Sequence, residues 1–334
     1  MNSFGKIFRV SIFGESHGES VGIVIDGCPA GIPLKHSDFN TDFSRRKSGS
    51  KGTTPRREAD IPRIMSGIFN DHTTGAPIMI MFENTNTRSA DYSKLRDIPR
   101  PGHADFTAQE KFGGYQDYRG GGHFSGRLTL GIVAAGVVAK KIIDPMLVTG
   151  SILEVGGSSE IESAIEQAMD KQDSIGGIIE CRIGEVPVAL GEPFFDSVEA
   201  VISHMVFSIP AIKGIEFGSG FQAAKMTGSQ HNDNIVNIDG TTETNHAGGI
   251  NGGITNGNEI VFRVAVKPTS STHQTQRTVN MKSGALEELS IEGRHDTCIA
   301  LRVPVVVESA AAIVMADLIL QAQQANRIHK QKPE

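Results

Sequence analysis

The order of the predicted strands and helices constrains the fold of this chain more than any other feature of its sequence. Runs rich in β-branched residues and bounded by glycine predict strands at residues 7–13, 21–25, 78–82, 175–182, 259–267 and 298–303. Helical spacing of apolar residues predicts helices at residues 38–47, 103–112, 125–143, 158–171, 196–207 and 308–326. This order is neither a regular strand–helix–strand alternation nor all-strand, so the predicted fold class is α+β. No repeat or linker interrupts it, and we expect a single domain over residues 1–334.

The composition places the chain among ordinary soluble globular proteins, with 38% hydrophobic and 21% charged residues. No run of 18 apolar residues and no signal-peptide core occurs, so we expect no membrane span and a cytoplasmic location. Cys28, Cys181 and Cys298 are odd in number and far apart, as in proteins of reducing compartments. The net charge of −6 argues against nucleic acid as the main partner.

Glycine is the over-represented residue, at 38 of 334 positions, and it gathers at 120–122, 248–249 and 252–253. Glycine allows positive φ and lets a backbone approach a ligand closely. Tight turns would explain any one cluster equally well. Several clusters near basic and histidine residues favour a ligand site.

Two glycine motifs point to other enzyme classes. Gly14–Gly18 matches GxSxG, but a nucleophile elbow needs a helix directly afterwards, and a strand pattern follows instead. Gly218–Ala223 matches GxGxxA after the strand-like run 212–217. This second match supports the alternative of an NAD(P)-dependent oxidoreductase, which requires a helix of at least two turns after Gly220. The residues before the polar stretch 228–234 leave little room for that helix.

Histidine spacing gives no signal for a metal site. His17, His103, His123 and His295 lie beside glycine or aspartate, but no HxxxH or HExxH pair occurs around them. We therefore predict no metal.

A basic stretch covers residues 45–63. Its two acidic residues are Glu58 and Asp60, and its cations are Arg45, Arg46, Lys47, Lys51, Arg56, Arg57 and Arg63. Arginine forks suit ligands that carry several phosphate or carboxylate groups. A solvated surface is the simpler interpretation for a basic loop alone. A non-catalytic anion or nucleic-acid binder is a third hypothesis, which predicts steeply salt-dependent binding.

Five separated segments share one further pattern. They are Phe-Gly-Glu-Ser-His-Gly at 13–18, Arg-Pro-Gly-His-Ala-Asp at 100–105, Asp-Tyr-Arg-Gly-Gly-Gly at 117–122, Asn-His-Ala-Gly-Gly-Ile at 245–250, and Lys-Pro-Thr-Ser-Ser at 267–271 followed by Gly-Arg-His-Asp at 293–296. In this order, and over nearly the whole chain, they resemble the chorismate synthase family.

The resemblance implies a β-α-β sandwich with antiparallel sheets packed against helices, and a homotetramer. It implies a lyase that uses reduced FMN to eliminate phosphate from 5-enolpyruvylshikimate 3-phosphate, giving chorismate in the last step of the shikimate pathway. Either NADPH or a separate reductase would reduce the flavin, and no motif distinguishes the two.

The resemblance also implies catalytic roles. His17 would protonate or stabilise the leaving phosphate, and His103 would balance the charge of reduced FMN near N1. Ser16 and Asp296 would relay the ring proton, with flavin N5 as its first acceptor, and Ser125 would complete the catalytic set.

Binding residues carry over in the same way. The segments imply substrate or NADPH contacts for Arg45, Arg46, Lys51 and Arg127. They imply FMN contacts for His123, Phe124, Ser125, Pro210, Ala211, Gly252, Lys267, Pro268, Thr269, Ser270, Ser271 and Arg294. Where many family members read Arg-Ser-Ser-Ala-Arg-Glu, this chain reads His-Phe-Ser-Gly-Arg-Leu at 123–128. The change from arginine to His123 puts a phosphate or flavin contact at that position in doubt.

Overall fold

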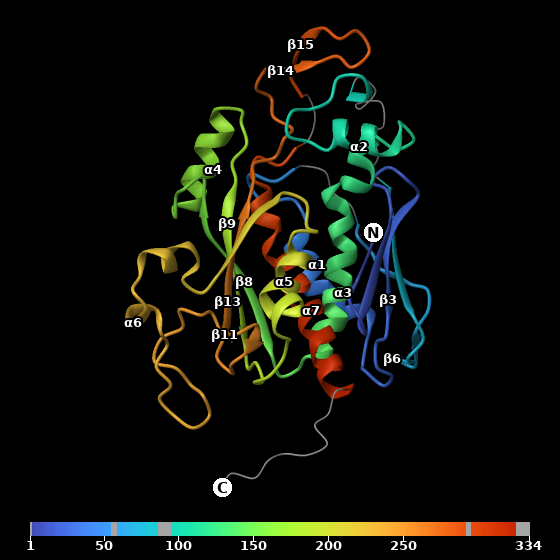
Figure 1. Ribbon diagram of the computed structural model, residues 1–334. Coiled ribbons are helices and arrows are strands. Elements are labelled where there is room, and N and C mark those ends of the chain that lie inside the picture. The colour runs from blue at the N-terminus through green and yellow to red at the C-terminus, as the bar shows by residue number, and fades with distance from the viewer. Residues whose placement is uncertain (1, 55–58, 86–94, 292–294, 325–334) are drawn as a thin grey trace.

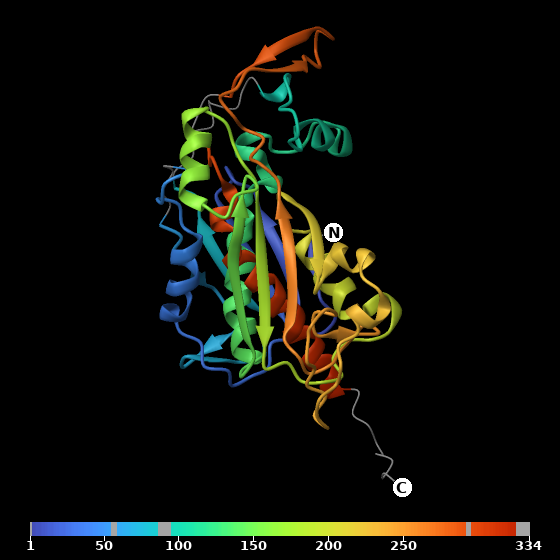
Figure 2. The same cartoon turned by 90° about the vertical axis from the view of Figure 1, so that its left-hand side faces the viewer.

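The structure, a computed structural model, describes residues 2–54, 59–85, 95–291 and 295–324. Two antiparallel sheets form its outer layers. The first has the order β1-β2-β3-β7-β4 and the second the order β10-β13-β9-β8. Helices α3 and α7 lie between them, as Figure 1 shows from one side and Figure 2 after a quarter turn. This arrangement confirms the predicted α+β class and the β-α-β sandwich.

The strands of the first sheet are β1 (Ser3–Phe4), β2 (Arg9–Gly14), β3 (Ser20–Asp26), β4 (Arg63–Ile64) and β7 (Ile78–Glu83). Those of the second are β8 (Leu147–Val155), β9 (Gly177–Gly184), β10 (Ile212–Phe217) and β13 (Ile260–Val266). Central β3 shows why the first sheet forms: Val21, Ile23 and Ile25 are fully buried, and alternate positions of a strand share a face. Ile23 pairs with Ile12 on β2 and with Ile80 on β7.

Helices α3 (Thr129–Ile142) and α7 (Pro304–Gln324) are apolar around most of their circumference, which is typical of helices buried on all sides. Pro304 opens α7 because a proline at the first helical position loses no intrahelical hydrogen bond. The two helices cross at Gly136, where a Cβ atom would come within 2.3 Å of Ser309 Cβ. In the described residues α7 alone is long and apolar enough to cross a membrane, but 83% of that window is buried in the sandwich.

Two buried carboxylates of α7 tie distant segments to the core. Asp317 accepts hydrogen bonds from the backbone N–H groups of residues 6–8 at 2.7–3.0 Å. Glu308 accepts from both Nη atoms of Arg45, from Lys140 Nζ at 3.1 Å and from the backbone N–H of Gly150 at 2.8 Å. Although burial raises the pKa of Glu308, its bonds to Arg45 and the charge of Lys140 outweigh burial and lower it.

Smaller elements cover the edges of the sandwich. The helices are η1 (His36–Phe39), α1 (Asn40–Arg46), α2 (Asp105–Phe112), η3 (Arg119–Phe124), η4 (Gly126–Leu128), α4 (Ile161–Asp170), η5 (Phe194–Asp196), α5 (Val198–Val206), η6 (Gly220–Lys225), α6 (Gly228–His231) and η7 (Ile299–Arg302). Three two-stranded ladders join β5 (Ile68–Phe69) to β6 (His72–Thr73), β11 (Ile250–Asn251) to β12 (Ile254–Thr255), and β14 (Gln276–Val279) to β15 (Leu286–Leu289). The β14–β15 hairpin projects from the body in both views (Figures 1 and 2).

Two sequence predictions are wrong. The predicted strand at 298–303 is instead the 3₁₀ helix η7 (Ile299–Arg302), because a short apolar run fits a buried helical turn as well as a strand. The oxidoreductase alternative fails at Gly220, which opens the six-residue 3₁₀ helix η6 and not an α-helix of two turns. After GxSxG the chain enters β3, as expected, so no nucleophile elbow forms.

Candidate active site

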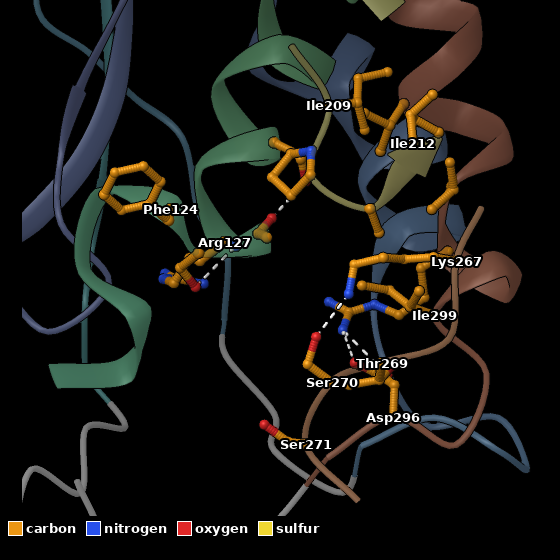
Figure 3. A pocket seen from close by; sticks show the side chains of 18 of the residues that line it. Phe124, Arg127, Ile209, Ile212, Lys267, Thr269, Ser270, Ser271, Asp296 and Ile299 are labelled. Carbon is orange, nitrogen blue, oxygen red and sulfur yellow. Dashed lines mark hydrogen bonds and ion pairs between the residues drawn. The ribbon is translucent and has the colours of Figure 1, made fainter. Parts of the chain in front are cut away.

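A cavity of about 890 Å³ opens where the loops from both sheets meet the N-terminal ends of α3 and α7. Figure 3 shows Phe124 and Arg127 on one wall, with Lys267, Ser270 and Asp296 on another. The lining comes from α1 with the loop after it, Asp60, residues 100–104, residues 120–129, residues 207–213, residues 267–271 and residues 295–306.

The lining carries a large excess of positive charge. Among the described residues it includes two aspartates, Asp60 and Asp296, against seven cations, namely Arg46, Lys47, Arg100, Arg127, Lys213, Lys267 and Arg302. Such a wall focuses a positive potential inside a cleft. The cavity is therefore suited to a ligand with several negative charges.

Three arginines come together at one end of the cavity. Arg46, at the end of α1, donates from Nε to Thr129 Oγ1 at 3.1 Å and from Nη2 to the carbonyl of Gly126 at 3.1 Å. Arg302 donates from Nε to the carbonyl of Arg46 at 2.9 Å and from Nη1 to Asp296 Oδ2 at 3.2 Å. Burial, followed by the charge of Arg302, lowers the pKa of Arg46 to about 9, which leaves it cationic at neutral pH.

The third arginine, Arg127, joins this cluster to the turn that carries His17. Its Nε donates to Asn84 Oδ1, and its Nη2 donates to the carbonyl of Glu83 at 3.2 Å. Asn84 Nδ2 in turn donates to the carbonyls of Glu15 and Gly18 at 3.0 and 2.9 Å. Asn84 therefore fixes the position of the 15–18 turn relative to Arg127.

The three glycines at 120–122 separate the two predicted catalytic histidines. All three have positive φ, between 53° and 81°. A Cβ atom on Gly120 would meet His17 Cδ2 at 2.3 Å, and one on Gly121 would lie 3.5 Å from His103 Nε2. Gly120 lines the cavity. Only glycine allows the chain to pass between the two rings at this separation.

Ser16 lies on the same side of the glycine turn as His17. Its hydroxyl would be 3.0 Å from a Cβ atom on Gly120. Ser16 Oγ is buried and has no hydrogen-bond partner among the described residues. A buried hydroxyl without a partner costs free energy, and Ser16 itself is not among the residues that line the cavity.

His103 is held by a buried acidic partner. Its Nδ1 lies 2.6 Å from Asp105 Oδ1. Arg100 donates to the same carboxylate from Nε at 2.7 Å and from Nη2 at 2.8 Å. If Nδ1 donates its proton to Asp105, Nε2 is the ring nitrogen that remains for a ligand. Arg100 Nη2 also lies 3.0 Å from His103 Nδ1, and Arg100 Nη1 donates to Ser271 Oγ at 3.1 Å.

The segment 267–271 lines the cavity next to residues 100–103. Lys267 Nζ donates to Ser270 Oγ at 2.6 Å and to the carbonyl of Gly102 at 3.1 Å. Burial and the nearby Lys213 lower the pKa of Lys267. Thr269 Oγ1 is a second buried hydroxyl without a partner in the described chain.

Ala211, Pro210, Pro268, Phe124 and Ser125 complete this lining. The carbonyl of Ala211, a residue with φ of 77°, accepts from the backbone N–H of Lys267 at 2.9 Å. Ser125 Oγ accepts from the backbone N–H of Arg127 at 3.3 Å and caps η4.

His123 lies at the edge of the cavity with both ring nitrogens engaged by protein. Nδ1 lies 2.8 Å from the carbonyl oxygen of Gly14, and Nε2 lies 3.2 Å from Asn2 Oδ1. The side chain that replaces the common arginine therefore ties η3 to β2.

Three residues assigned to the site from sequence lie elsewhere, and a fourth is not described. Arg45 points to Glu308, Lys51 pairs with Glu166 on the surface, and Gly252 occupies the exposed β11–β12 turn. None of these three lines the cavity. Arg294 falls outside the described residues. Asp296, Arg46 and Arg127 do line the cavity, with the FMN set from 123–125, 210–211 and 267–271.

Sequence reasoning missed the partners that orient these groups: Asp60, Asn84, Arg100, Asp105 and Arg302. Arg100 and Asp105 occur within the segment at 100–105 that carries the resemblance, so their position was a usable signal. Nothing in the local sequence marks Asp60 or Arg302, which reach the cavity only through the tertiary fold.

A model of the family described as chorismate synthase matches residues 8–320. A chorismate synthase of Chitinophaga pinensis is 64% identical over 331 residues, covering 99% of this chain and all of the relative. A chorismate synthase of Dehalococcoides mccartyi is 45% identical over 362 residues, which cover 99% of this chain and 100% of the relative. A crystal structure of chorismate synthase superposes with a TM-score of 0.73 at 26% identity, over 95% of this chain and 93% of the other. The chain belongs to the chorismate synthase family, whose members are carbon–oxygen lyases that eliminate phosphate to form chorismate.

Proposed function

We propose that this chain, acting as one catalytic domain over residues 1–334, eliminates phosphate from 5-enolpyruvylshikimate 3-phosphate inside the cationic cavity, with reduced FMN as cofactor. The observation that carries the proposal is the charge of the lining, seven cations against two aspartates in the described residues. The substrate has one phosphate and two carboxylates, which match this excess. Arginine forks bind both groups with paired hydrogen bonds.

The arginine cluster is the proposed substrate end. Arg46, Arg127 and Arg302 present buried or half-buried guanidinium groups there. Because most of their donors are already fixed by protein acceptors, the cluster is preorganised and needs little reordering when an anion binds.

The lining from residues 123–125, 210–211 and 267–271 suits FMN. Lys267 supplies a cation, Thr269 a buried hydroxyl without a partner, and Phe124 an apolar ring on the wall. The residues proposed to hold the cofactor are Phe124, Ser125, Pro210, Ala211 and Lys267–Ser271. When bound, reduced FMN would supply the electron density that assists departure of the allylic phosphate.

Side chains of the protein would then donate a proton to the leaving phosphate and carry away the ring proton. His17, beside Gly120, protonates or stabilises the leaving phosphate. His103, oriented by Asp105, offers Nε2 toward the cofactor side of the cavity. Ser16 and Asp296 relay the ring proton away, and Ser125 keeps the turn before α3 in place.

The electrons that reduce the flavin could come from NADPH bound by this chain or from a separate reductase. Arg45 and Lys51, the pair that the resemblance associates with NADPH, are paired with Glu308 and Glu166 outside the cavity. Anaerobic addition of NADPH to protein with oxidised FMN decides the question: flavin bleaching means that the chain reduces its own cofactor, and unchanged absorbance means that a separate reductase does so.

We infer a homotetramer in the cytoplasm. Support for an interface comes from large apolar side chains that are exposed in the isolated chain, among them Phe194 at 85% and Phe195 at 94%. The three cysteines are free and buried, as in proteins of a reducing compartment. Sedimentation at several protein concentrations tests the assembly.

The deciding experiment is anaerobic turnover of 5-enolpyruvylshikimate 3-phosphate with chemically reduced FMN, following both phosphate release and chorismate. We expect equal amounts of the two products, and none when the FMN is oxidised. Folded protein with reduced FMN that forms no chorismate would refute the proposal.

A further inference from the structure

Asp60 is a buried carboxylate between two arginines of the cavity, and neither the sequence motifs nor the proposed reaction assigns it a role. Its side chain is 5% exposed, and those of Arg46 and Arg127 are 4% and 7% exposed. Asp60 itself lines the cavity. It is therefore placed to act on the groups that face a bound anion.

The two oxygens of Asp60 contact different arginines. Oδ1 accepts from Arg127 Nη1 at 2.8 Å, and Oδ2 lies 3.5 Å from Arg46 Nη1. Among the described residues, Asp60 provides the carboxylate within ion-pair distance of each of these two guanidinium groups. Within the described ranges, the other hydrogen bonds of both arginines go to neutral oxygens, so Asp60 is the charged link between them there.

The backbone at Asp60 is held in an uncommon conformation. Its φ is +50°, in the left-handed region that is uncommon for residues other than glycine but better tolerated by asparagine and aspartate. Such a conformation persists only where surrounding contacts determine it. The contacts of the Asp60 side chain in the described residues are those with the two arginines.

Asp60 also sets the charge of the arginine cluster. Arg46, Arg127 and Arg302 contribute three positive charges, and Asp60 and Asp296 contribute two negative charges, which leaves an excess of one. Without Asp60 the excess would be two. The cavity would then attract the bound substrate and the released phosphate more strongly. Because this attraction would not be specific to the transition state, it would not accelerate the chemical step.

We propose that Asp60 is a positioning residue that holds Arg46 and Arg127 side by side and limits the positive charge presented to the anion. The part of this proposal that concerns turnover rests on the proposed function. The part that concerns anion affinity does not, because inorganic phosphate can be used as the probe.

The test is Asp60→Asn, which keeps the shape of the side chain and removes its charge. Calorimetry with inorganic phosphate, at constant ionic strength, should show affinity raised about tenfold, as expected for losing a nearby negative charge in a partly desolvated site. Turnover should fall about 10²-fold, because the arginines lose their fixed separation. General damage to the fold would lower both quantities, so the opposite directions identify the proposed role.

Asp71→Asn is the matched control. Asp71 also has positive φ, +60°, and pairs with Lys35, but its side chain is 62% exposed and lies outside the cavity. This variant should leave phosphate affinity and turnover unchanged. Equal effects in the two variants would overturn the proposal, as would unchanged values in Asp60→Asn, or affinity and turnover that fall together.

Asp60→Glu serves as a second variant if Asp60→Asn does not fold. It restores the charge on a longer side chain, so phosphate affinity should stay near that of the parent while turnover remains low. Turnover equal to that of the parent would contradict a positioning role. If the parent itself makes no chorismate, the proposed function fails, and the phosphate measurements still decide the effect of Asp60 on affinity.

Discussion

The Asp105 carboxylate lies 2.6 Å from His103 Nδ1 while it also accepts two hydrogen bonds from the side chain of Arg100. Burial by itself raises the pKa of Asp105, but the bonds from Arg100 and His103 outweigh burial and hold that pKa well below its usual range. Asp105 therefore stays ionised at neutral pH as an acceptor beside His103 Nδ1.

Asp105→Asn should lower turnover about 10- to 100-fold, in the range seen when the partner of a functional histidine is removed. Because the folded pKa of Asp105 is depressed, its stabilisation is fully present above about pH 4 and is lost as pH falls through the folded pKa. The variant should therefore lose less stability than the parent between pH 4 and pH 2. Urea titrations across that range measure this, and parallel curves would contradict the assignment.

His17→Ala and His103→Ala should each reduce turnover by about 10²–10⁴-fold if the rings act in proton transfer. Binding of reduced FMN, followed by fluorescence, should weaken more in His103→Ala, whose ring we propose to lie on the cofactor side. Near-parental turnover in both variants would remove the assigned roles. Unchanged circular dichroism is the control for folding.

Arg45 and Arg46 are adjacent in sequence, but we expect different effects when each is replaced. Arg46→Gln should lower kcat/KM about 10²-fold, because a buried, hydrogen-bonded cation of the cavity is lost. Arg45→Gln should leave KM for the substrate nearly unchanged, since its guanidinium is bound to Glu308. A raised KM in Arg45→Gln would show instead that Arg45 contacts the ligand.

Glu308→Ala should lower the free energy of unfolding by about 2–3 kcal/mol, because a buried acceptor is removed from the Gly150 N–H and from two cations. Arg45→Gln should cost less, since that side chain is 42% exposed. Denaturant unfolding of both variants measures the difference. Equal losses would mean that the ion pair, rather than the buried acceptor, provides the stability.

Gly120→Ala should lower turnover about 10²-fold by displacing the ring of His17, since a Cβ atom would lie 2.3 Å from Cδ2 at a φ of +60°. Gly31→Ala is the control, with φ of +87° and no atom within 4 Å of a Cβ. It carries similar backbone strain and should lose stability but not activity. Equal kinetics in the two variants would show that the Gly120–His17 contact is unimportant.

The sequence by itself determined most of the elements and the family. Periods of two and of 3.6 residues are local signals, so β2, β3, β7, β9, β13 and the helices α3, α4, α5 and α7 appeared near their predicted positions. Strand β8 and the β14–β15 hairpin were missed, and residues 298–303 were misassigned. Short runs of this kind take their structure from the surface they pack against, which local spacing does not encode.

Only the tertiary structure decided which of the predicted site residues face the cavity and which do not. Arg45 and Arg46 differ by one position on α1, and a helix turns about 100° per residue, so one side chain faces Glu308 and the other faces the cavity. Asp60 and Arg302 became part of the site through contacts that join separate segments, whereas the partners of Asp105 lie close to it in sequence. A sequence pattern identifies which residues carry chemistry, but their orientation and net charge depend on partners that folding brings together from distant parts of the chain.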